Sequence, residues 1–428
     1  MASHFNNAPA VKTCPPDIKA ERQKICKTKG FTDNQWYCHL ARQTVFFSAF
    51  SNLPFARNEA VETAHGIFKL APHILQGYGT GLEKSTMDEN MISGIISLEH
   101  VKSLDDYPDK WSLQGTDIFD NPNLPPLRIK VAILEKAPDE KGRFSAILIL
   151  STHSMFEGVD ATSLARSRSV RRGAVTKKPA PVSMIKRFGY ESLAAALAPL
   201  QLLAAFLFAP RTGDVGFKTL VISRSKLRLG ATKLGISQQA LIFALASYAI
   251  NGKEKLFSKK CLSTLYADLN QSSHFKTNDE FFQFRMIDLD LLVKEDFADF
   301  ALGVAKALQK TQNSNRSHTQ TLLNAMFGMH RRLYSLFPFL YTPQLFRFSA
   351  GYDFTLSLTP PQHIGEGLTK RLMEPVFTGT YHPGFNMCVF SPGRTFVTFS
   401  FSLRQRYLNN VENIPVLLDN LLLSRSSP

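Results

Sequence analysis

The feature that most constrains the fold is the run FSAILILS at 144–151, because the strand it predicts is apolar on both faces. A strand with one face in water alternates apolar and polar side chains, so this run indicates a central strand that is covered on both sides. The preceding pattern LPPLRIKVAIL, at 124–134, has a period of two and predicts another strand. The short turn PDEKGR between them predicts that the two strands pair as a hairpin.

Helices and strands are mixed along the rest of the chain, without a regular alternation of the two. Apolar spacing predicts helices over 58–76, 192–209, 235–253, 294–312, 319–337 and 410–424, and strands over 91–101, 216–228, 259–270, 281–291, 352–358, 387–391 and 395–402. This order favours an α+β protein with two lobes of similar size over one doubly wound sheet. We expect an amino-terminal lobe at 1–175, a crossover at 176–213 and a carboxy-terminal lobe at 214–428.

The predicted crossover contains an uncharged apolar segment, SLAAALAPLQLLAAFLFA at 192–209. As a helix it would be about 27 Å long, close to the ~30 Å hydrocarbon thickness of a bilayer. Pro199 lies in its middle and alanine is its commonest residue, which argues against a membrane span. We expect a helix that is buried or lies on a surface, such as that of a bilayer. A basic stretch without apolar periodicity, 166–183, precedes it.

Composition narrows the function classes. Hydrophobic residues make up 44% of the chain and include 34 Phe, which is enough for a large core or for a cavity that holds apolar ligands. The net charge of +15 favours anionic partners such as nucleic acid, acidic lipid headgroups or coenzyme A. No zinc-finger spacing, RNA-binding strand or basic heptad region supports nucleic acid. Five widely spaced cysteines, and no apolar run in the first 19 residues, favour reduced thiols in the cytoplasm.

Most catalytic motifs are missing from the sequence. It contains no G-x-S-x-G, H-E-x-x-H, C-x-x-C or G-x-x-x-x-G-K-[ST] pattern, which argues against hydrolase, zinc-protease and P-loop chemistry. His153 is the residue that stands out, because it directly follows the apolar strand and precedes a turn with Glu157 and Gly158. An imidazole ring held at a strand end suits general-base catalysis, since its ordinary pKa lies near physiological pH.

The stretch THSMFEG, at 152–158, resembles the H-H-x-x-x-D-G motif of the chloramphenicol acetyltransferase-like superfamily. That superfamily includes the condensation domains of peptide synthetases, the BAHD acyltransferases and the bacterial wax ester synthase/diacylglycerol acyltransferases. His153 matches the second, catalytic histidine of the motif, and Gly158 matches its glycine. Thr152 stands in place of the first histidine, and Glu157 stands in place of the aspartate.

Other stretches resemble the wax ester synthase-like branch, and together they cover about residues 60–405. PPLR at 125–128 is similar to the family's P-L-W. In LGISQQALIFALASYAI, Gln238 and Gln239 take the places of an Asn-Asp pair that begins a helix. FRMIDLDL is similar to the strand after G-N-R-F-G. YDFTLSLTPPQ is similar to the S-N-V-P-G-P strand, with Ser357 and Pro360 retained.

The resemblance implies two lobes that share a central tunnel, which an acyl thioester and an acceptor enter from opposite sides. His153 would take the acceptor's proton as the acceptor attacks the thioester carbonyl. The backbone amides from Phe156 to Val159 are candidates for stabilising the oxyanion. Gln238, Gln239 and Ser357 are further oxyanion or substrate candidates. Glu157, with Gly158, would have a structural role. The resemblance implies no metal and no bound cofactor, with acyl-CoA or an acyl-carrier thioester as co-substrate.

The interpretation that follows is an O-acyltransferase with a lipid-like hydroxyl acceptor, located in the cytoplasm and peripheral on an anionic membrane surface. A second interpretation is a condensation-type acyltransferase of natural-product synthesis. A third is a superfamily member that has lost catalysis and acts as a binding protein. A nucleic-acid binder comes last, because no motif supports it. The acceptor, the acyl chain length and the oligomeric state are left open.

Overall fold

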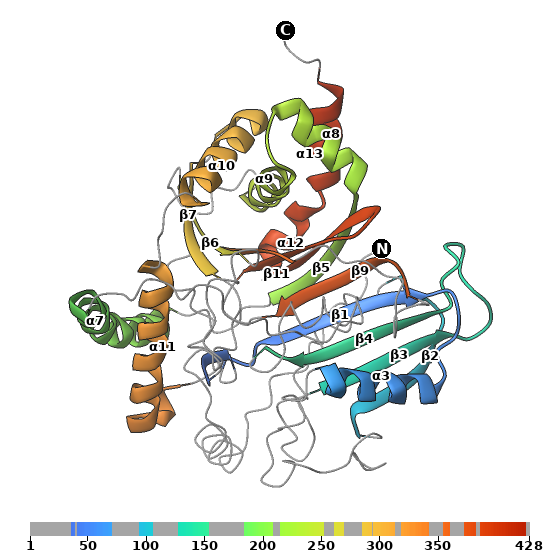
Figure 1. Ribbon diagram of the computed structural model, residues 1–428, viewed down its shortest axis with the longest axis horizontal. Helices are drawn as coiled ribbons and strands as arrows, with labels where there is room; N and C mark the ends of the chain where they lie inside the picture. Colours follow the sequence, from blue (N-terminus) through green and yellow to red (C-terminus); the bar gives the residue numbers. More distant parts are fainter. Residues whose placement is uncertain are drawn as a thin grey trace.

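Two β-sheets, each covered by helices, organise the chain in the computed structural model (Figure 1). The structure describes residues 36–38, 41–70, 94–105, 127–153, 184–208, 215–251, 261–268, 285–292, 294–312, 318–341, 354–359, 372–381 and 386–424. Helices α8, α9, α10 and α13 lie on one side of the second sheet, and α3 lies against the first sheet. The prediction of a mixed fold with two lobes is confirmed.

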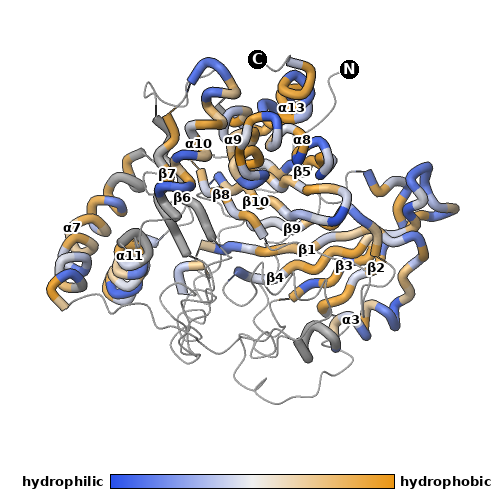
Figure 2. Tube along the Cα trace, turned by 45° about the horizontal axis from the view of Figure 1, so that its top comes forward, coloured by the Kyte–Doolittle hydropathy of each residue, from blue (hydrophilic) through white to orange (hydrophobic). Residues whose placement is uncertain are grey.

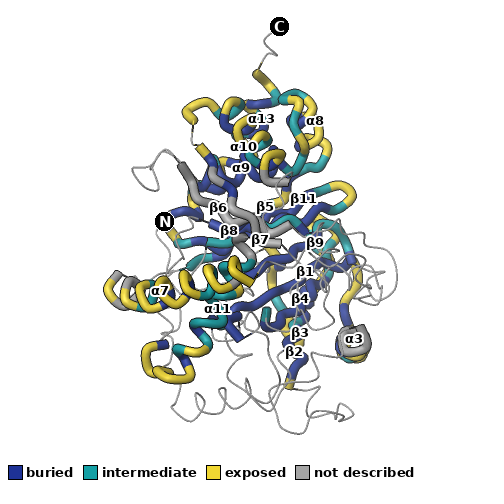
Figure 3. The backbone as a smooth tube through the Cα atoms, turned by 60° about the vertical axis from the view of Figure 1, so that its left-hand side comes forward, coloured by how far each residue is buried: buried dark blue, intermediate teal, exposed yellow. Residues whose placement is uncertain are grey.

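Within the described residues, the first sheet has five strands in the order β2-β3-β4-β1-β9. The strands are β1 (Thr44–Ser51), β2 (Ile96–Val101), β3 (Leu127–Leu134), β4 (Ser145–Thr152) and β9 (Leu372–Tyr381). β4 pairs antiparallel with β3 and with β1, so the predicted hairpin and the predicted central strand are both confirmed. Every residue of β1 and β4 is buried, as the dark blue of these strands in Figure 3 shows.

Two strands of this sheet are not among the elements that the sequence predicts. β1 has the pattern TVFFSAFS, whose neighbouring phenylalanines break the period-two alternation. β9 contains Pro375 and lies in the carboxy-terminal half of the sequence, yet it pairs antiparallel with β1. The sheet is therefore completed by a strand from the far side of the expected boundary, which was placed at 214.

The second sheet, in the part of the chain that the structure describes, has six strands in the order β5-β11-β10-β8-β6-β7. These are β5 (Val215–Ser223), β6 (Cys261–Asp268), β7 (Arg285–Leu292), β8 (Phe354–Leu358), β10 (Met387–Pro392) and β11 (Phe396–Arg404). The predicted strand over 216–228 is wrong in its last part, because the chain turns into a helix at Arg224. The backbone N–H of Arg224 donates to the carbonyl of Thr395 at this turn, which fixes where the strand ends.

The helices are α3 (Arg57–Leu70), α7 (Met184–Phe208), α8 (Arg224–Leu234), α9 (Gln238–Asn251), α10 (Phe297–Gln312), α11 (His318–Leu336), α12 (Gln405–Val411) and α13 (Ile414–Leu423), with the 3₁₀ turn η4 (Pro338–Leu340). The single helix predicted at the carboxy terminus is two helices, because α12 ends before Pro415 at the start of α13. None of the described helices combines the length and apolar content needed to cross a bilayer. Figure 2 shows that the apolar residues follow the strands of both sheets.

Three apolar clusters form the described core. The largest lies between the second sheet and its helices, and Phe243, Phe390 and Phe399 are wholly buried in it. Another lies between the first sheet and α3. The third lies on the other face of the first sheet and includes Phe217 of β5, whose ring meets Phe46 edge-on at 5.0 Å. Phe217 therefore joins the two halves of the molecule through apolar contact.

Candidate functional site

His153 lies at the end of the central strand, as the sequence predicts. Its backbone N–H donates to the carbonyl oxygen of Gln43, at a distance of 2.8 Å, and its side chain is half-buried. Thr152, just before it, is fully buried and pairs with Thr44 of β1, which in turn pairs with Tyr381 of β9. Three strand ends therefore meet beside the histidine, and they hold its backbone on the edge of a rigid sheet.

A short helical turn at 36–38 connects this sheet edge to the second half of the chain. The backbone N–H of Gln43 donates to the carbonyl of Cys38 at 3.0 Å. Tyr37 stacks on Phe327 of α11, with 4.3 Å between ring centroids. Trp36 meets Tyr334 of α11 edge-on at 5.3 Å. These contacts join α11, through the turn at 36–38, to the sheet edge that carries His153 (Figure 1).

A second histidine, His330 of α11, is buried in the same aromatic cluster. Its Nδ1 lies 3.0 Å from the hydroxyl of Tyr341, and its Nε2 lies 3.1 Å from Oε1 of Gln201 on α7. Burial lowers the pKa of His330 to about 4, so the ring is neutral at pH 7. A neutral ring with a proton on Nε2 satisfies both contacts, because Gln201 then accepts and Tyr341 donates. Both ring nitrogens are engaged, so His330 ties α7 to α11.

Strands β8, β10 and β11 of the second sheet alternate apolar residues on one face with mostly hydroxyl side chains on the other, where Met387, Val389 and the neighbouring Phe217 of β5 are apolar exceptions. The apolar face packs under the helices and is made by Phe354, Leu356, Cys388, Phe390, Val397, Phe399, Phe401 and Leu403. The opposite side, which we term the hydroxyl face, carries Thr355, Ser357, Thr359, Ser391, Thr398, Ser400 and Ser402. Apart from the half-buried Ser357, all of these residues are buried.

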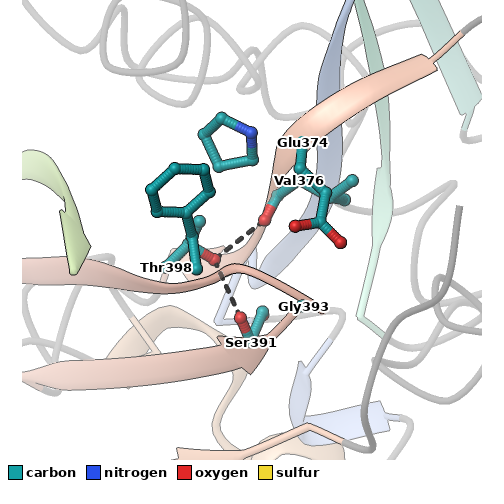
Figure 4. Close-up of a pocket in the computed structure, with 7 residues that line it drawn as sticks. Glu374, Val376, Ser391, Gly393 and Thr398 are labelled. Carbon is teal, nitrogen blue, oxygen red and sulfur yellow. Dashed lines mark hydrogen bonds between the residues drawn. The ribbon is translucent and has the colours of Figure 1, made fainter. Parts of the chain in front are cut away.

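Strand β9 of the first sheet covers one end of the hydroxyl face. Thr378 of β9 hydrogen-bonds to Ser391. The hydroxyl of Thr398 donates to the carbonyl of Val376 at 2.8 Å, as the dashed line in Figure 4 shows. Further along, the hydroxyls of Ser400 and Ser402 have no hydrogen-bond partner among the described residues. Buried hydroxyls are normally satisfied, so these two mark a place where water or a polar ligand gains a hydrogen bond.

Figure 4 shows a small pocket at the covered end of the hydroxyl face. Its lining residues are Glu374, Pro375, Val376, Ser391, Gly393, Phe396 and Thr398. Its enclosed space of about 10 Å³ is enough for about one water molecule. The Glu374 carboxylate already accepts from the backbone N–H groups of Arg394 and Thr395, at 2.7 and 2.9 Å. The pocket is therefore a structural feature and does not hold a substrate.

The other predicted site residues fall on separate elements or outside the description. Gln238 and Gln239 begin α9, where the Ser237 hydroxyl caps the helix by accepting from the N–H of Ala240 at 3.1 Å. The buried Nε2 of Gln238 has no hydrogen-bond partner within the described part of the chain. Ser357 lies on the hydroxyl face. Four predicted residues lie outside the described residues: Phe156, Glu157, Gly158 and Val159.

Sequence reasoning missed Gln43, the hydroxyl face and one buried cation. Arg128 of β3 is only 7% exposed and donates through Nη1 to the carbonyl of Leu127 at 2.8 Å. Arg128 and Lys130 occupy alternate positions of β3, a pattern typical of a solvent-facing side, so the sequence alone did not mark Arg128 as buried. The alternation of hydroxyl and apolar residues in TFVTFSFS was readable. Gln43 gave no signal, because it contributes its backbone carbonyl. Within the described ranges, no cluster of three or more His, Cys, Asp or Glu could hold a metal ion.

No family model and no curated protein sequence matches the chain. Solved structures do match it. A wax ester synthase/diacylglycerol acyltransferase from Marinobacter aquaeolei VT8 is 14% identical, with a TM-score of 0.52 over 89% of this chain and 93% of that one. The TRI3 trichothecene 15-O-acetyltransferase from Fusarium sporotrichioides is 9% identical, with a TM-score of 0.53 over 93% and 94%.

The cyclization-docking bidomain of EpoB from Sorangium cellulosum is 13% identical, with a TM-score of 0.50 over 93% of this chain and 85% of that one. At these identities the matches show the fold alone, so the role of each site residue depends on its own position and contacts. All three matches extend over most of both chains, so they include both sheets. The chain therefore has the two-lobed, chloramphenicol acetyltransferase-like fold that the sequence resemblance predicts, and it shares this fold with two acyltransferases and a cyclization-docking bidomain.

Proposed function

We propose that this protein transfers an acyl group from a thioester donor to a hydroxyl acceptor, with His153 as the general base. The observation that carries the proposal is the position of His153, half-buried at the end of a buried central strand and hydrogen-bonded through its backbone to Gln43. The fold is shared with a wax ester synthase/diacylglycerol acyltransferase and a trichothecene acetyltransferase, which supports acyl transfer as the reaction class.

In the proposed reaction, the imidazole of His153 takes the proton of the acceptor hydroxyl while the oxygen attacks the thioester carbonyl. A C–O bond forms, the C–S bond breaks, and the leaving thiolate takes the proton back from the imidazolium. No covalent acyl-enzyme is required, because holding both substrates in line supplies much of the rate enhancement. No metal or bound cofactor takes part, and acyl-CoA or an acyl-carrier thioester is the co-substrate.

We propose a tunnel between the lobes, with the hydroxyl face as part of its wall. Ser357 lies on this face, and Ser400 and Ser402 carry buried hydroxyls without a described partner. Backbone amides between Phe156 and Val159 would stabilise the oxyanion. Gln238 and Gln239 would contact substrate, and Glu157 with Gly158 would shape the turn after His153.

We propose a lipid-like acceptor, because the chain is rich in Phe and its net charge of +15 favours anionic interfaces. A hydroxyl on a small natural product is the second candidate, and the similarity to the trichothecene acetyltransferase favours it. Both candidates use the same proton transfer at His153. They differ only in the acceptor that the proposed tunnel admits.

A substrate screen tests the proposal. The purified full chain is incubated with acetyl-, octanoyl- or palmitoyl-CoA and with a long-chain alcohol, a diacylglycerol, a hydroxylated small metabolite or an amine. Release of free thiol and the mass of the ester are measured. We expect ester from at least one hydroxyl acceptor. If no pair releases thiol while calorimetry detects acyl-CoA binding, the chain is a binding protein and the proposed function is wrong.

A further inference from the structure

Helix α7 has its large apolar side chains on the outside of the molecule. The exposed ones are Met184, Ile185, Phe188, Leu193, Leu197, Leu200, Leu203 and Leu207. Leu200 and Leu207 are each 59% exposed and Phe188 is 72% exposed. Figure 2 colours much of this helix as hydrophobic, and Figure 3 shows most of it as exposed. We term this set of residues the α7 face.

The inner side of the same helix is small and polar. Ala194 and Ala198 are fully buried, and Gln201 lies within hydrogen-bond distance of His330 on α11. A surface helix of a globular protein normally shows the reverse pattern, with its apolar stripe toward the core. Alanines, a glutamine and the half-buried Leu202 therefore face the protein, while the other leucines of α7 are exposed to a partner.

The end of α11 extends this apolar surface. Leu336, Phe337, Phe339 and Leu340 are exposed, with Phe339 at 71%. Tyr341 follows them and hydrogen-bonds to His330, which also contacts Gln201 of α7. The exposed residues 336–340 and helix α7 therefore both lie next to elements that contact His330. Exposed large apolar residues in such number mark an interaction site.

The charge of the sequence around α7 indicates what the partner is. Residues 161–190 contain eight Lys or Arg and no Asp or Glu. A cluster of four to eight basic residues beside an apolar helix is typical of binding to anionic phospholipid. A second copy of this chain offers no such charge complementarity, because it carries the same basic sequence.

We infer that the α7 face docks this protein on an anionic phospholipid surface, with α7 lying in the plane of the interface. An interfacial helix inserts its apolar side by about 5–10 Å, while basic residues attract the acidic headgroups. The inference adds a membrane partner to the proposed function and rests on that function for the lipid-like acceptor. It needs no catalysis, so binding is measured without substrate.

Vesicle flotation tests the inference with the full chain. The vesicles are phosphatidylcholine alone, or phosphatidylcholine with about one third phosphatidylserine, at low and at roughly 0.15 M salt. We expect flotation with the acidic vesicles, and less with neutral vesicles or added salt. The variant L200Q/L203Q/L207Q should lower partitioning by about tenfold or more, because it removes apolar area from the contact.

A matched control removes equally exposed apolar residues elsewhere. Leu229 of α8 is 59% exposed, Val416 of α13 is 57% and Leu423 is 81%. The variant L229Q/V416Q/L423Q should bind vesicles as the wild type does. If the wild-type protein does not float with acidic vesicles, or if both triple variants float equally well, the inference is wrong. If ultracentrifugation shows that the wild type and the control variant are dimers while the α7 variant is a monomer, a second copy covers the α7 face and the lipid inference is also wrong.

A second measurement decides the question if the α7 variant fails to fold. Leu203→Trp places a fluorophore on the α7 face, and Leu229→Trp serves as its control. Brominated phosphatidylcholine mixed with phosphatidylserine should quench the tryptophan at 203 and not the one at 229, and equal quenching would overturn the inference.

Acyl transfer between soluble short-chain substrates should be the same in the α7 variant and the wild type. Loss of vesicle binding alone therefore leaves the proposed function standing. Loss of acyl transfer alone likewise leaves the lipid inference standing.

Discussion

The backbone N–H of His153 donates to the carbonyl of Gln43, and the N–H of Gln43 donates to the carbonyl of Cys38. This chain of backbone bonds connects the candidate base to the turn at 36–38, whose aromatic rings pack on α11. The position of His153 thus depends on a segment before β1 and on a helix from the second half of the sequence. Changes in that helix are expected to reach His153 through the packing.

Replacing the candidate base, His153, should strongly reduce the rate of acyl transfer. We expect His153→Ala to lower kcat/KM for the best substrate pair by about 10²–10⁴, because the acceptor hydroxyl then has no positioned base. His65→Ala, on the exposed side of α3, is the control and should leave kcat/KM unchanged. Thiol release measures both. Equal activity of His153→Ala and the wild type would rule out His153 as the base.

The hydroxyl face predicts a steric effect at Ser357. Ser357→Phe should lower kcat/KM by about tenfold or more, because a ring at this half-buried position fills space on the proposed tunnel wall. Ser225→Phe, at an exposed position of α8, is the control for the added ring. Thermal unfolding of both variants separates lost activity from lost folding. Full activity with the ring at 357 would show that substrate does not pass this face.

His330 should make the free energy of unfolding depend on pH. Its pKa is about 4 in the folded chain and 6.5 when unperturbed, so the unfolded chain binds the proton more tightly. The stabilisation is fully present above about pH 6.5 and is lost as the pH falls toward 4, with a total of about 3 kcal/mol. Urea unfolding between pH 4 and 7.5 measures it.

His330→Gln removes the titrating ring, so the stability difference between wild type and variant should shrink as the pH falls. His65→Gln, on the exposed side of α3, is the control and should follow the wild-type curve. A pH-independent difference between wild type and His330→Gln would show that folding does not lower the pKa of His330.

Two glycines should respond oppositely to alanine. A Cβ at Gly379 of β9 would lie 2.3 Å from a ring carbon of Phe46, so Gly379→Ala should destabilise the fold by about 1–3 kcal/mol. At Gly303, inside α10, a Cβ meets nothing within 4 Å, so Gly303→Ala should stabilise it by about 0.5–1 kcal/mol. Chemical denaturation gives both values. A neutral Gly379→Ala would mean that β9 does not pack closely on β1.

Cys388 should be inert in the native protein. It is fully buried as a free thiol, and burial raises its pKa, so the reactive thiolate does not form near neutral pH. We expect mass spectrometry after iodoacetamide treatment to find Cys388 unmodified in buffer and alkylated in guanidinium. Rapid labelling of Cys388 without denaturant would show that the cluster under α9 opens easily.

The sequence by itself determined the elements whose patterns are local. The apolar run at 144–151 predicted a central strand, and the turn before it predicted the hairpin with β3. The same reasoning placed His153 at the strand end, because a strand that is apolar on both faces has to end where polar residues begin. The helical spacing of α9, α10 and α11 was readable for the same reason.

Only the tertiary structure decided which distant segments meet. β9 completes the first sheet although about two hundred residues separate it from β4, and nothing in its local pattern names β1 as its partner. Gln43 supports His153 through a backbone carbonyl, which every residue type carries. The outward leucines of α7 are invisible to periodicity, because a helical pattern shows that one side is apolar and does not show which side faces the protein. Pairing and exposure depend on contacts between segments far apart in the chain, so they are set by the fold as a whole.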